Sequence, residues 1–223
     1  MMQGKLIVLE GIDGSGKSTQ YQKLCRRLED EGRAFRRVVF PRYDKESSAL
    51  IRQYLGGDFG SKPGDVNAYA ASTFYAVDRF ASYKTDWQDY YQSGGLVLAD
   101  RYTTSNACHQ GSKLAEGERQ RFFDWLYDFE FRLLELPRPS LVIYLDIDLE
   151  VSRRQMLSRQ EATHTAADIH EKDFAYLAAC LDAGRYAAEH YGWKRVRCVA
   201  DGVMRSVEDI HEEIYRAVSR ALA

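Results

Sequence analysis

Short apolar segments rich in β-branched residues alternate with helical patterns along this 223-residue chain. Each short segment is typical of a strand buried on both faces, and each longer segment carries apolar residues at three- and four-residue spacing. The predicted strands are 5–10, 36–40, 95–100, 141–146 and 195–200, and the predicted helices are 17–31, 66–92, 117–135, 149–159, 171–191 and 206–222. Such alternation implies right-handed crossovers and a parallel sheet with helices on both faces. The sequence therefore predicts an α/β protein in which residues 1–223 form a single domain.

The overall charge balance points away from polyanionic partners. The chain has a formal net charge of −2 at pH 7, and no stretch reaches the roughly 18 apolar residues needed to span a bilayer. Its first residues carry charge too early for a signal peptide. The four cysteines are far apart and form no C-x-x-C pair, which favours reduced thiols over a metal site or disulfides. We expect a soluble, cytoplasmic protein that binds neither nucleic acid nor a membrane.

The stretch EGIDGSGKST follows the first predicted strand and precedes the first predicted helix. It fits the pattern G-x-x-x-x-G-K-[ST], whose glycines let backbone N–H groups turn toward phosphate oxygens. In such a P-loop Lys17 reaches the β- and γ-phosphates, and the Ser18 hydroxyl is a ligand for Mg²⁺. A glycine turn with a surface lysine is the alternative, and the agreement of motif, strand and helix disfavours it. The candidate nucleotide-binding residues are Gly11, Gly14, Ser15, Gly16, Lys17, Ser18 and Thr19.

Asp100 and Arg101 lie at the carboxyl end of the predicted strand 95–100. A carboxylate there can hold Mg²⁺, and the planar fork of an arginine can reach a second phosphate. A surface Asp–Arg pair that caps the strand is the alternative. The chain lacks the N-K-x-D motif of regulatory GTPases and the signature loop of transporter ATPases, so a kinase is favoured among P-loop proteins.

Two further constellations point to a second substrate. Arg42 and Tyr43 follow the second predicted strand, at the same edge of the sheet as the P-loop. Tyr75 and Arg79 are four residues apart on a predicted helix that Asp65 could cap, so they share one face. An aromatic ring beside a guanidinium suits a nucleobase, which stacks on the ring and accepts hydrogen bonds. Ordinary helix packing with a surface salt bridge is the alternative for that pair.

In this order, GIDGSGKST, FPRY, YAVDR, DRYTTSNACHQG and LPRPSLVIYLDI resemble the thymidylate kinases, which phosphorylate dTMP with ATP. The resemblance runs from residue 5 to about residue 191, and the DRY, FPRY and Tyr-x-x-x-Arg elements are more specific than the P-loop. It implies a P-loop nucleoside monophosphate kinase-type three-layer fold with a five-stranded parallel sheet and a short lid. It also implies dTMP and ATP as substrates, Mg²⁺ with ATP as the phosphoryl donor, and a homodimer.

The resemblance assigns roles at the nucleoside end of the acceptor. Tyr75 would stack on thymine, Arg79 would donate to a carbonyl of the base, and Asn106 matches a residue near the base. Phe74 would take the place of Tyr75 if the helix register were shifted by one residue. His109 departs from the family, where a tyrosine or phenylalanine commonly packs against the sugar, so selectivity for deoxyribose is in question at this position.

Other roles concern the phosphates. Asp13 matches an acid that approaches the 3′-hydroxyl of the sugar and is a candidate catalytic residue. Arg101 resembles the family's ligand for the dTMP phosphate, with Asp100 beside Mg²⁺. Arg42 and Tyr43 would border the same phosphate.

Thymidylate kinases need an arginine over the phosphoryl group in transfer, from either the P-loop or the lid. This P-loop has Gly14 and Ser15 instead of an arginine, so the chain resembles the class whose arginine comes from the lid, at about 152–172. The candidates are Arg153, Arg154 and Arg159, and a solvated helix face is the alternative for this basic run.

The resemblance implies direct in-line transfer of the γ-phosphoryl group from Mg·ATP to dTMP, giving dTDP and ADP. The acceptor phosphate is already anionic, so no strong general base is needed, and Lys17, Mg²⁺, Arg101 and a lid arginine would neutralise charge. One alternative is a deoxynucleoside kinase of the same fold, which would need a carboxylate base for a 5′-hydroxyl. The other is a P-loop protein that binds ATP without catalysis, in which we would expect Lys17, Asp100 or Arg101 to be lost.

Overall fold

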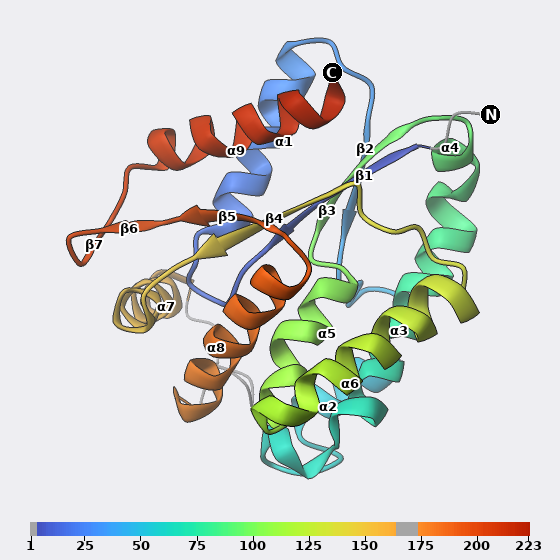
Figure 1. The fold of residues 1–223 in the computed structure, drawn as a ribbon, viewed down its shortest axis with the longest axis vertical. Coiled ribbons are helices and arrows are strands. Elements are labelled where there is room, and N and C mark those ends of the chain that lie inside the picture. Colours follow the sequence, from blue (N-terminus) through green and yellow to red (C-terminus); the bar gives the residue numbers. More distant parts are fainter. Residues whose placement is uncertain (1–3, 164–173) are drawn as a thin grey trace.

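The computed structural model describes residues 4–163 and 174–223, and the side chains of residues 4–158 and 174–223. Its centre is a five-stranded parallel sheet in the order β2-β3-β1-β4-β5, which confirms the predicted α/β fold (Figure 1). The strands are β1 Lys5–Glu10, β2 Arg36–Val39, β3 Leu96–Asp100, β4 Leu141–Asp146 and β5 Lys194–Arg197.

Helices cover both faces of the sheet, as Figure 1 shows for α1 and α9 on one side and α3, α5 and α6 on the other. The longer helices are α1 Lys17–Asp30, α2 Ala49–Gly56, α3 Ala68–Ser82, α6 Glu116–Tyr127, α7 Leu149–Thr163, α8 Phe174–His190 and α9 Val207–Leu222. The shorter helical segments are η1 Glu46–Ser48, η2 Pro63–Asp65, η3 Tyr83–Trp87, α4 Gln88–Gln92, α5 Thr103–His109, η4 Gly111–Lys113 and η5 Asp128–Leu133.

Alternate side chains of the central strand enter two separate cores. On β1, Leu6 and Val8 pack in the core that also contains residues of α5 and α6, whereas Ile7 and Leu9 pack in the core under α1 and α9. Because both faces are buried, the strand reads as a continuous apolar run instead of an alternating one.

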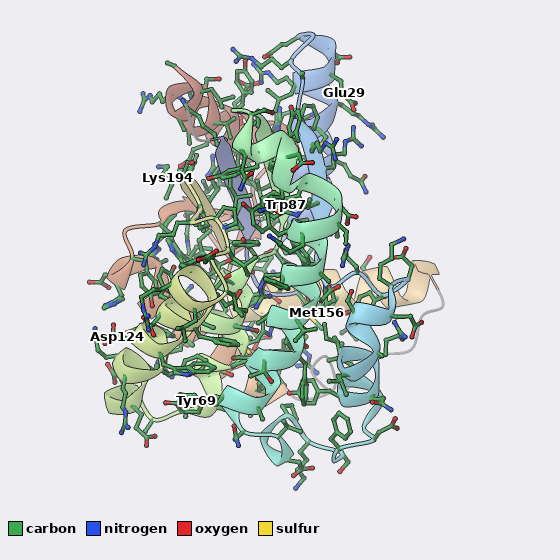
Figure 2. The ribbon with its side chains drawn as sticks, turned by 90° about the vertical axis from the view of Figure 1, so that its right-hand side faces the viewer. Glu29, Tyr69, Trp87, Asp124, Met156 and Lys194 are labelled. Atoms are coloured by element: carbon green, nitrogen blue, oxygen red, sulfur yellow. The ribbon has the colours of Figure 1, made fainter. Side chains whose placement is uncertain are left out.

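The prediction of one helix over 66–92 is wrong in two respects. The helix is interrupted by the π-helical segment η3, which ends at the buried side chain of Trp87 (Figure 2). Its N-cap is Asn67, whose side chain accepts from the backbone N–H of Ala70 at 2.8 Å, and not Asp65. Asp65 instead accepts from the backbone N–H of Lys62 and caps a separate short turn. Aspartate and asparagine are both good N-caps. Because Asp65 belongs to the short turn Pro63–Asp65, Asn67 is the residue that caps α3.

The last predicted strand, 195–200, is also divided in the structure. β5 ends at Arg197, and β6 Val199–Ala200 pairs antiparallel with β7 Val203–Met204 across a turn at Asp201 and Gly202. The apolar run could not reveal this break, because strand partners are chosen by tertiary contacts. The predicted helices also omitted α2 and α5, which lie in segments with polar and glycine residues at their ends. Within residues 4–163 and 174–223, no helix is both long and apolar enough to cross a bilayer.

Candidate active site

The P-loop connects the carboxyl end of β1 to the first turn of α1. Gly14 and Gly16 have left-handed backbone angles, with φ of 75° and 81°. A Cβ atom at Gly14 would lie 2.4 Å from the carbonyl oxygen of Ser152, so α7 packs directly against the loop. The first turn of α1 has no side-chain cap, which leaves its N–H groups available to an anion. Residues 12–19 and Gln155 line a cavity of about 250 Å³ at this point.

Lys17 of this loop is held by Asp100 of the neighbouring strand. Leu9 of β1 is in register with Asp100 of β3, so the two strand ends emerge side by side. Lys17 Nζ donates to Asp100 Oδ1 at 2.8 Å, and both side chains are at most 10% exposed. Burial and the nearby Arg101 lower the pKa of Lys17, although the carboxylate of Asp100 opposes this change. The Lys17 ammonium group is therefore positioned at the edge of the P-loop cavity.

Arg101 is oriented by three groups from three different segments. Its Nη2 donates to Asp13 Oδ1 at 2.6 Å, and its Nη1 lies 3.5 Å from Glu10 Oε1 and 3.1 Å from His109 Nε2. Its backbone has a left-handed φ of 67°, which turns the side chain out of the strand direction. Burial alone would lower the pKa of Arg101, but the carboxylates of Asp13 and Glu10 raise it overall. The guanidinium is thus a fixed positive charge beside the P-loop.

Glu10 is a site residue to which the sequence analysis assigned no role. It is fully buried, and Oε1 accepts from the backbone N–H of Gly11 at 2.9 Å. Oε2 accepts from the hydroxyls of Thr104 and Ser105 at 2.7 Å each. Glu10 therefore ties the start of the P-loop to α5. A charged residue that ends an apolar strand was the signal in the sequence.

A second cavity, of about 280 Å³, opens beside the P-loop. The candidate residues that line it are Asp13, Lys17, Ser18, Tyr43, Tyr75, Arg79, Asp100, Arg101, Asn106 and His109. The predicted aromatic and basic residues of the helix are thus brought together with the DRY segment. Asp13, Lys17 and Ser18 line both cavities, so the phosphate cradle opens directly into this second space.

Two candidates for the second substrate, Arg42 and Phe74, are not among the residues that line this cavity, although they neighbour lining residues in the sequence. The guanidinium of Arg42 is bound by the carboxylates of Asp78 and Asp86 and by the hydroxyl of Ser47. The ring of Phe74 packs against the ring of Phe59 at 5.7 Å between centroids, and also against Tyr54. Arg42 holds the loop after β2 against α3, and Phe74 packs among neighbouring rings.

Arg79 and Asn106 are held by buried partners at the inner end of the cavity. Arg79 is 1% exposed, and its Nε and Nη2 donate to the two oxygens of Glu130 at 2.7 and 2.5 Å. Asn106 Nδ2 donates to the carbonyl of Ser72 at 3.2 Å. The sequence analysis did not single out Glu130, because nothing in the local pattern near residue 130 links it to a helix 51 residues away.

The arginines expected in the lid lie on α7. The guanidinium of Arg153 is 5.2 Å from the centre of the Phe174 ring. Arg154 Nη2 donates to the carbonyl of Gly202, in the turn between β6 and β7, at 3.0 Å. The side chain of Arg159 and residues 164–172 of the expected lid lie outside the described part of the chain. Among the α7 side chains that the structure describes, Gln155 lines the P-loop cavity.

The residues predicted to hold Mg²⁺ meet at one cavity. Ser18 and Asp100 both line the second cavity, next to Lys17. A hydroxyl and a carboxylate are hard oxygen ligands, and Mg²⁺ takes one or two such protein ligands together with waters and substrate phosphates. No group of three histidine, cysteine, aspartate or glutamate residues with metal-ligand geometry occurs in the described part of the chain. The oxygen donors therefore fit a metal ion carried in by a nucleotide.

Comparisons with known proteins identify the family of this chain. A family model described as thymidylate kinase matches residues 9–214. A thymidylate kinase of Mycobacterium tuberculosis is 32% identical over 170 residues, which cover 75% of this chain and 78% of that protein. A thymidylate kinase of Caenorhabditis elegans is 30% identical over 227 residues, covering 98% and 93%. The solved structure of a thymidylate kinase from Candida albicans superposes with a TM-score of 0.72 at 20% identity, covering 98% and 92%, and supports the fold.

Proposed function

The chain belongs to the thymidylate kinase family, and we propose on this premise that it transfers the γ-phosphoryl group of ATP to dTMP, giving dTDP and ADP. The observation that carries the proposal is the junction of the two cavities at Asp13, Lys17 and Ser18. A donor phosphate in the cradle would face an acceptor phosphate in the second cavity across these residues. That arrangement suits transfer between two bound nucleotides.

ATP would be bound at the P-loop. The N–H groups of Gly14, Gly16 and the first turn of α1, including Thr19, would surround the phosphates. Gly11 and Ser15 would shape the loop, because their N–H groups are bound by Glu10 Oε1 and by the carbonyl of Ile12. Mg²⁺ would be held by Ser18 and Asp100, and it would supply positive charge that neutralises the phosphates. Lys17 would move from Asp100 to the phosphates, since both groups lie at the mouth of the cradle.

The acceptor dTMP would occupy the second cavity. Its base would stack on Tyr75, with Arg79 and Asn106 at the base edge, and its sugar would lie near His109. Arg101 would bind the phosphate, because its guanidinium is fixed by Asp13 and Glu10 beside Lys17. Tyr43 would border that phosphate, and Asp13 would approach the 3′-hydroxyl. Arg42 would act indirectly, through the loop that carries Tyr43, and Phe74 would support the wall behind Tyr75.

Catalysis would rest on position and charge. The acceptor oxygen is already anionic, so the reaction requires in-line alignment and neutralisation of developing charge more than proton abstraction. Lys17 and Arg101 would supply positive charge on the side of the P-loop, together with the Mg²⁺ that Ser18 and Asp100 would hold. Arg153, Arg154 or Arg159 would supply it from the lid at 152–172, because the P-loop itself contains no arginine.

We further propose that residues 1–223 act as one domain in a cytoplasmic homodimer. Tyr69, Val77 and Phe80 are exposed apolar side chains along one face of α3, which a second copy could cover. All four cysteines are free and buried, in keeping with a reducing compartment.

The decisive experiment is ADP release from Mg·ATP with dTMP, dUMP, UMP, dCMP, AMP or thymidine as acceptor. We expect strong stimulation by dTMP, weak stimulation by UMP, and none by thymidine. Equal rates with dTMP and UMP would show that His109 admits ribose. Stimulation by thymidine would favour a nucleoside kinase, and no stimulation by any acceptor would favour a binding protein without catalysis.

A further inference from the structure

The carboxylate of Glu130 is at the centre of a buried hydrogen-bond network behind the second cavity. Glu130 is fully buried and is not among the residues that line the cavity. Its oxygens accept from Arg79 Nε and Nη2, from Thr103 Oγ1 at 2.6 Å, and from Asn106 Nδ2 at 3.5 Å. Glu130 lies on the π-helical segment η5, a rare geometry that recurs at functional sites. It can therefore affect a ligand only through the residues that it holds.

Glu130 fixes the plane of the Arg79 guanidinium. The bidentate pair uses Nε and Nη2, and Nη1 makes a longer contact of 3.4 Å with the carbonyl of Tyr102. Arg79 nevertheless lines the cavity. Since an arginine has only donors, the edge that it presents to a ligand is a hydrogen-bond donor in every state of the site.

Glu130 also fixes which way the Asn106 amide points. Asn106 Nδ2 lies between the carbonyl of Ser72 and Glu130 Oε1, and both of these groups accept hydrogen bonds. A flip of the amide would direct Oδ1 at two acceptors, so Nδ2 is held toward Ser72 and Glu130. The Oδ1 atom remains as an acceptor on a residue that lines the cavity.

The two residues together present one donor and one acceptor. Thymine and uracil carry the complement, a carbonyl at position 4 next to an N–H at position 3. Cytosine carries the reverse, an amino group at position 4 next to an acceptor nitrogen. A mismatched base would leave buried polar groups unpaired, which is costly.

We propose that Glu130 is a positioning residue that sets this donor–acceptor pattern and thereby selects 4-keto over 4-amino pyrimidine nucleotides. The proposal rests on the assignment of dTMP to the second cavity. It concerns Glu130, which lies behind the residues that would contact the base. Because the Glu130 carboxylate can only accept hydrogen bonds, it prevents a flip of the Asn106 amide and so keeps the donor and the acceptor in place.

The test compares wild type with Glu130→Gln, using dTMP, dUMP and dCMP as acceptors, together with calorimetric binding of dTMP. Glutamine keeps the shape but supplies its own donor, so Arg79 loses a contact and the Asn106 amide can flip. We expect KM and Kd for dTMP to rise at least about tenfold while kcat changes less than about threefold. The ratio of kcat/KM for dTMP over dCMP should fall at least about tenfold, and the ratio for dTMP over dUMP should stay constant.

Asp128→Asn is the matched control, because Asp128 lies on the same π-helical segment and pairs with Arg132 at the surface. It should behave like wild type in every assay. A folded Glu130→Gln enzyme with unchanged KM and an unchanged dTMP-to-dCMP ratio would overturn the proposal. A wild-type enzyme that dTMP does not stimulate would overturn the assignment of dTMP itself, and with it this inference.

If Glu130→Gln does not fold, Glu130→Asp takes its place. Aspartate keeps a carboxylate that can only accept hydrogen bonds, but its shorter side chain places this carboxylate farther from Arg79 and Asn106. KM for dTMP should rise at least about tenfold while the preference for dTMP over dCMP is retained, because the pattern still cannot reverse. Unchanged KM, or a loss of preference, would contradict the inference.

Discussion

Lys17 Nζ lies 2.8 Å from Asp100 Oδ1, so the cation of the P-loop is paired with the carboxylate at the end of the adjacent strand. The pair is nearly excluded from solvent, so the Lys17 ammonium group is held at the entrance of the P-loop cavity. Binding of a nucleotide must exchange one anionic partner of Lys17 for another.

Lys17→Ala should lower kcat at least about a hundredfold, since a fixed charge near the transferring phosphate is lost. The measurement is dTMP-dependent ADP release at saturating Mg·ATP. Lys23→Ala is the control, because Lys23 is on the same helix but pairs with Glu208 at the surface. Near-normal turnover in Lys17→Ala would contradict the P-loop assignment.

Gly14→Ala should raise KM for ATP and lower stability. Its Cβ would meet the Ser152 carbonyl at 2.4 Å, at a left-handed φ of 75°. Gly32→Ala is the matched control, because Gly32 has a φ of 68° and no atom within 4 Å of an added Cβ. It should cost about 1 kcal/mol of stability and leave KM for ATP unchanged. Equal effects of the two substitutions, measured by urea unfolding and kinetics, would mean that contact with α7 does not shape the cradle.

Arg42→Ala should reduce stability by roughly 2–4 kcal/mol, because it leaves the buried Asp78 carboxylate without its cation. Asp78→Asn in addition should recover part of this loss, a coupling that a double-mutant cycle in urea measures. An unchanged stability with a large rise in KM for dTMP would instead place Arg42 directly on the acceptor phosphate.

In the proposed homodimer, Val77→Glu should disrupt the contact between the two copies, so that the variant sediments as a monomer. Val77 is 52% exposed on α3, in the apolar face with Tyr69 and Phe80. A charge there could not be buried without a partner. Val207→Glu is the control, since Val207 is 40% exposed on α9, across the sheet from α3 (Figure 1). A dimer that survives Val77→Glu would locate the contact elsewhere.

Stability should rise with pH above pH 8 through Lys113. Burial lowers the pKa of Lys113 to about 8, and its Nζ donates to Tyr54 and to the carbonyl of Val66. Between pH 8 and the ordinary lysine range, the unfolded chain binds a proton that the folded chain has lost, so the free energy of unfolding increases with pH. Urea unfolding of wild type and Lys113→Met from pH 7 to pH 10 measures the difference. The free energy of unfolding of Lys113→Met minus that of wild type should decrease as pH rises. A difference that stays constant from pH 7 to pH 10 would contradict the prediction.

Much of the site followed from local patterns. The P-loop motif, with Gly14, Gly16 and Lys17, is contiguous and lies between a strand and a helix. The phosphate-binding loop could therefore be predicted from the local sequence alone. Asp100 ends a strand that is parallel to the first and Arg101 follows it, which places both residues at the same edge of the sheet as the P-loop. The four-residue spacing on a helix indicated Tyr75 and Arg79, the resemblance to the family added Asn106, and all three line one cavity.

Other features depended on contacts between distant segments. The sequence alone determined the alternation of strands and helices and the positions of the motifs, because periodicity and turn residues act over a few neighbours. Only the tertiary structure decided that Arg42 faces Asp78 and that Glu130 holds Arg79. It also decided that β6 pairs with β7 in a separate two-stranded sheet and does not extend β5. Ion pairs and strand partners are chosen by which groups become buried together, and burial is a property of the whole packed chain.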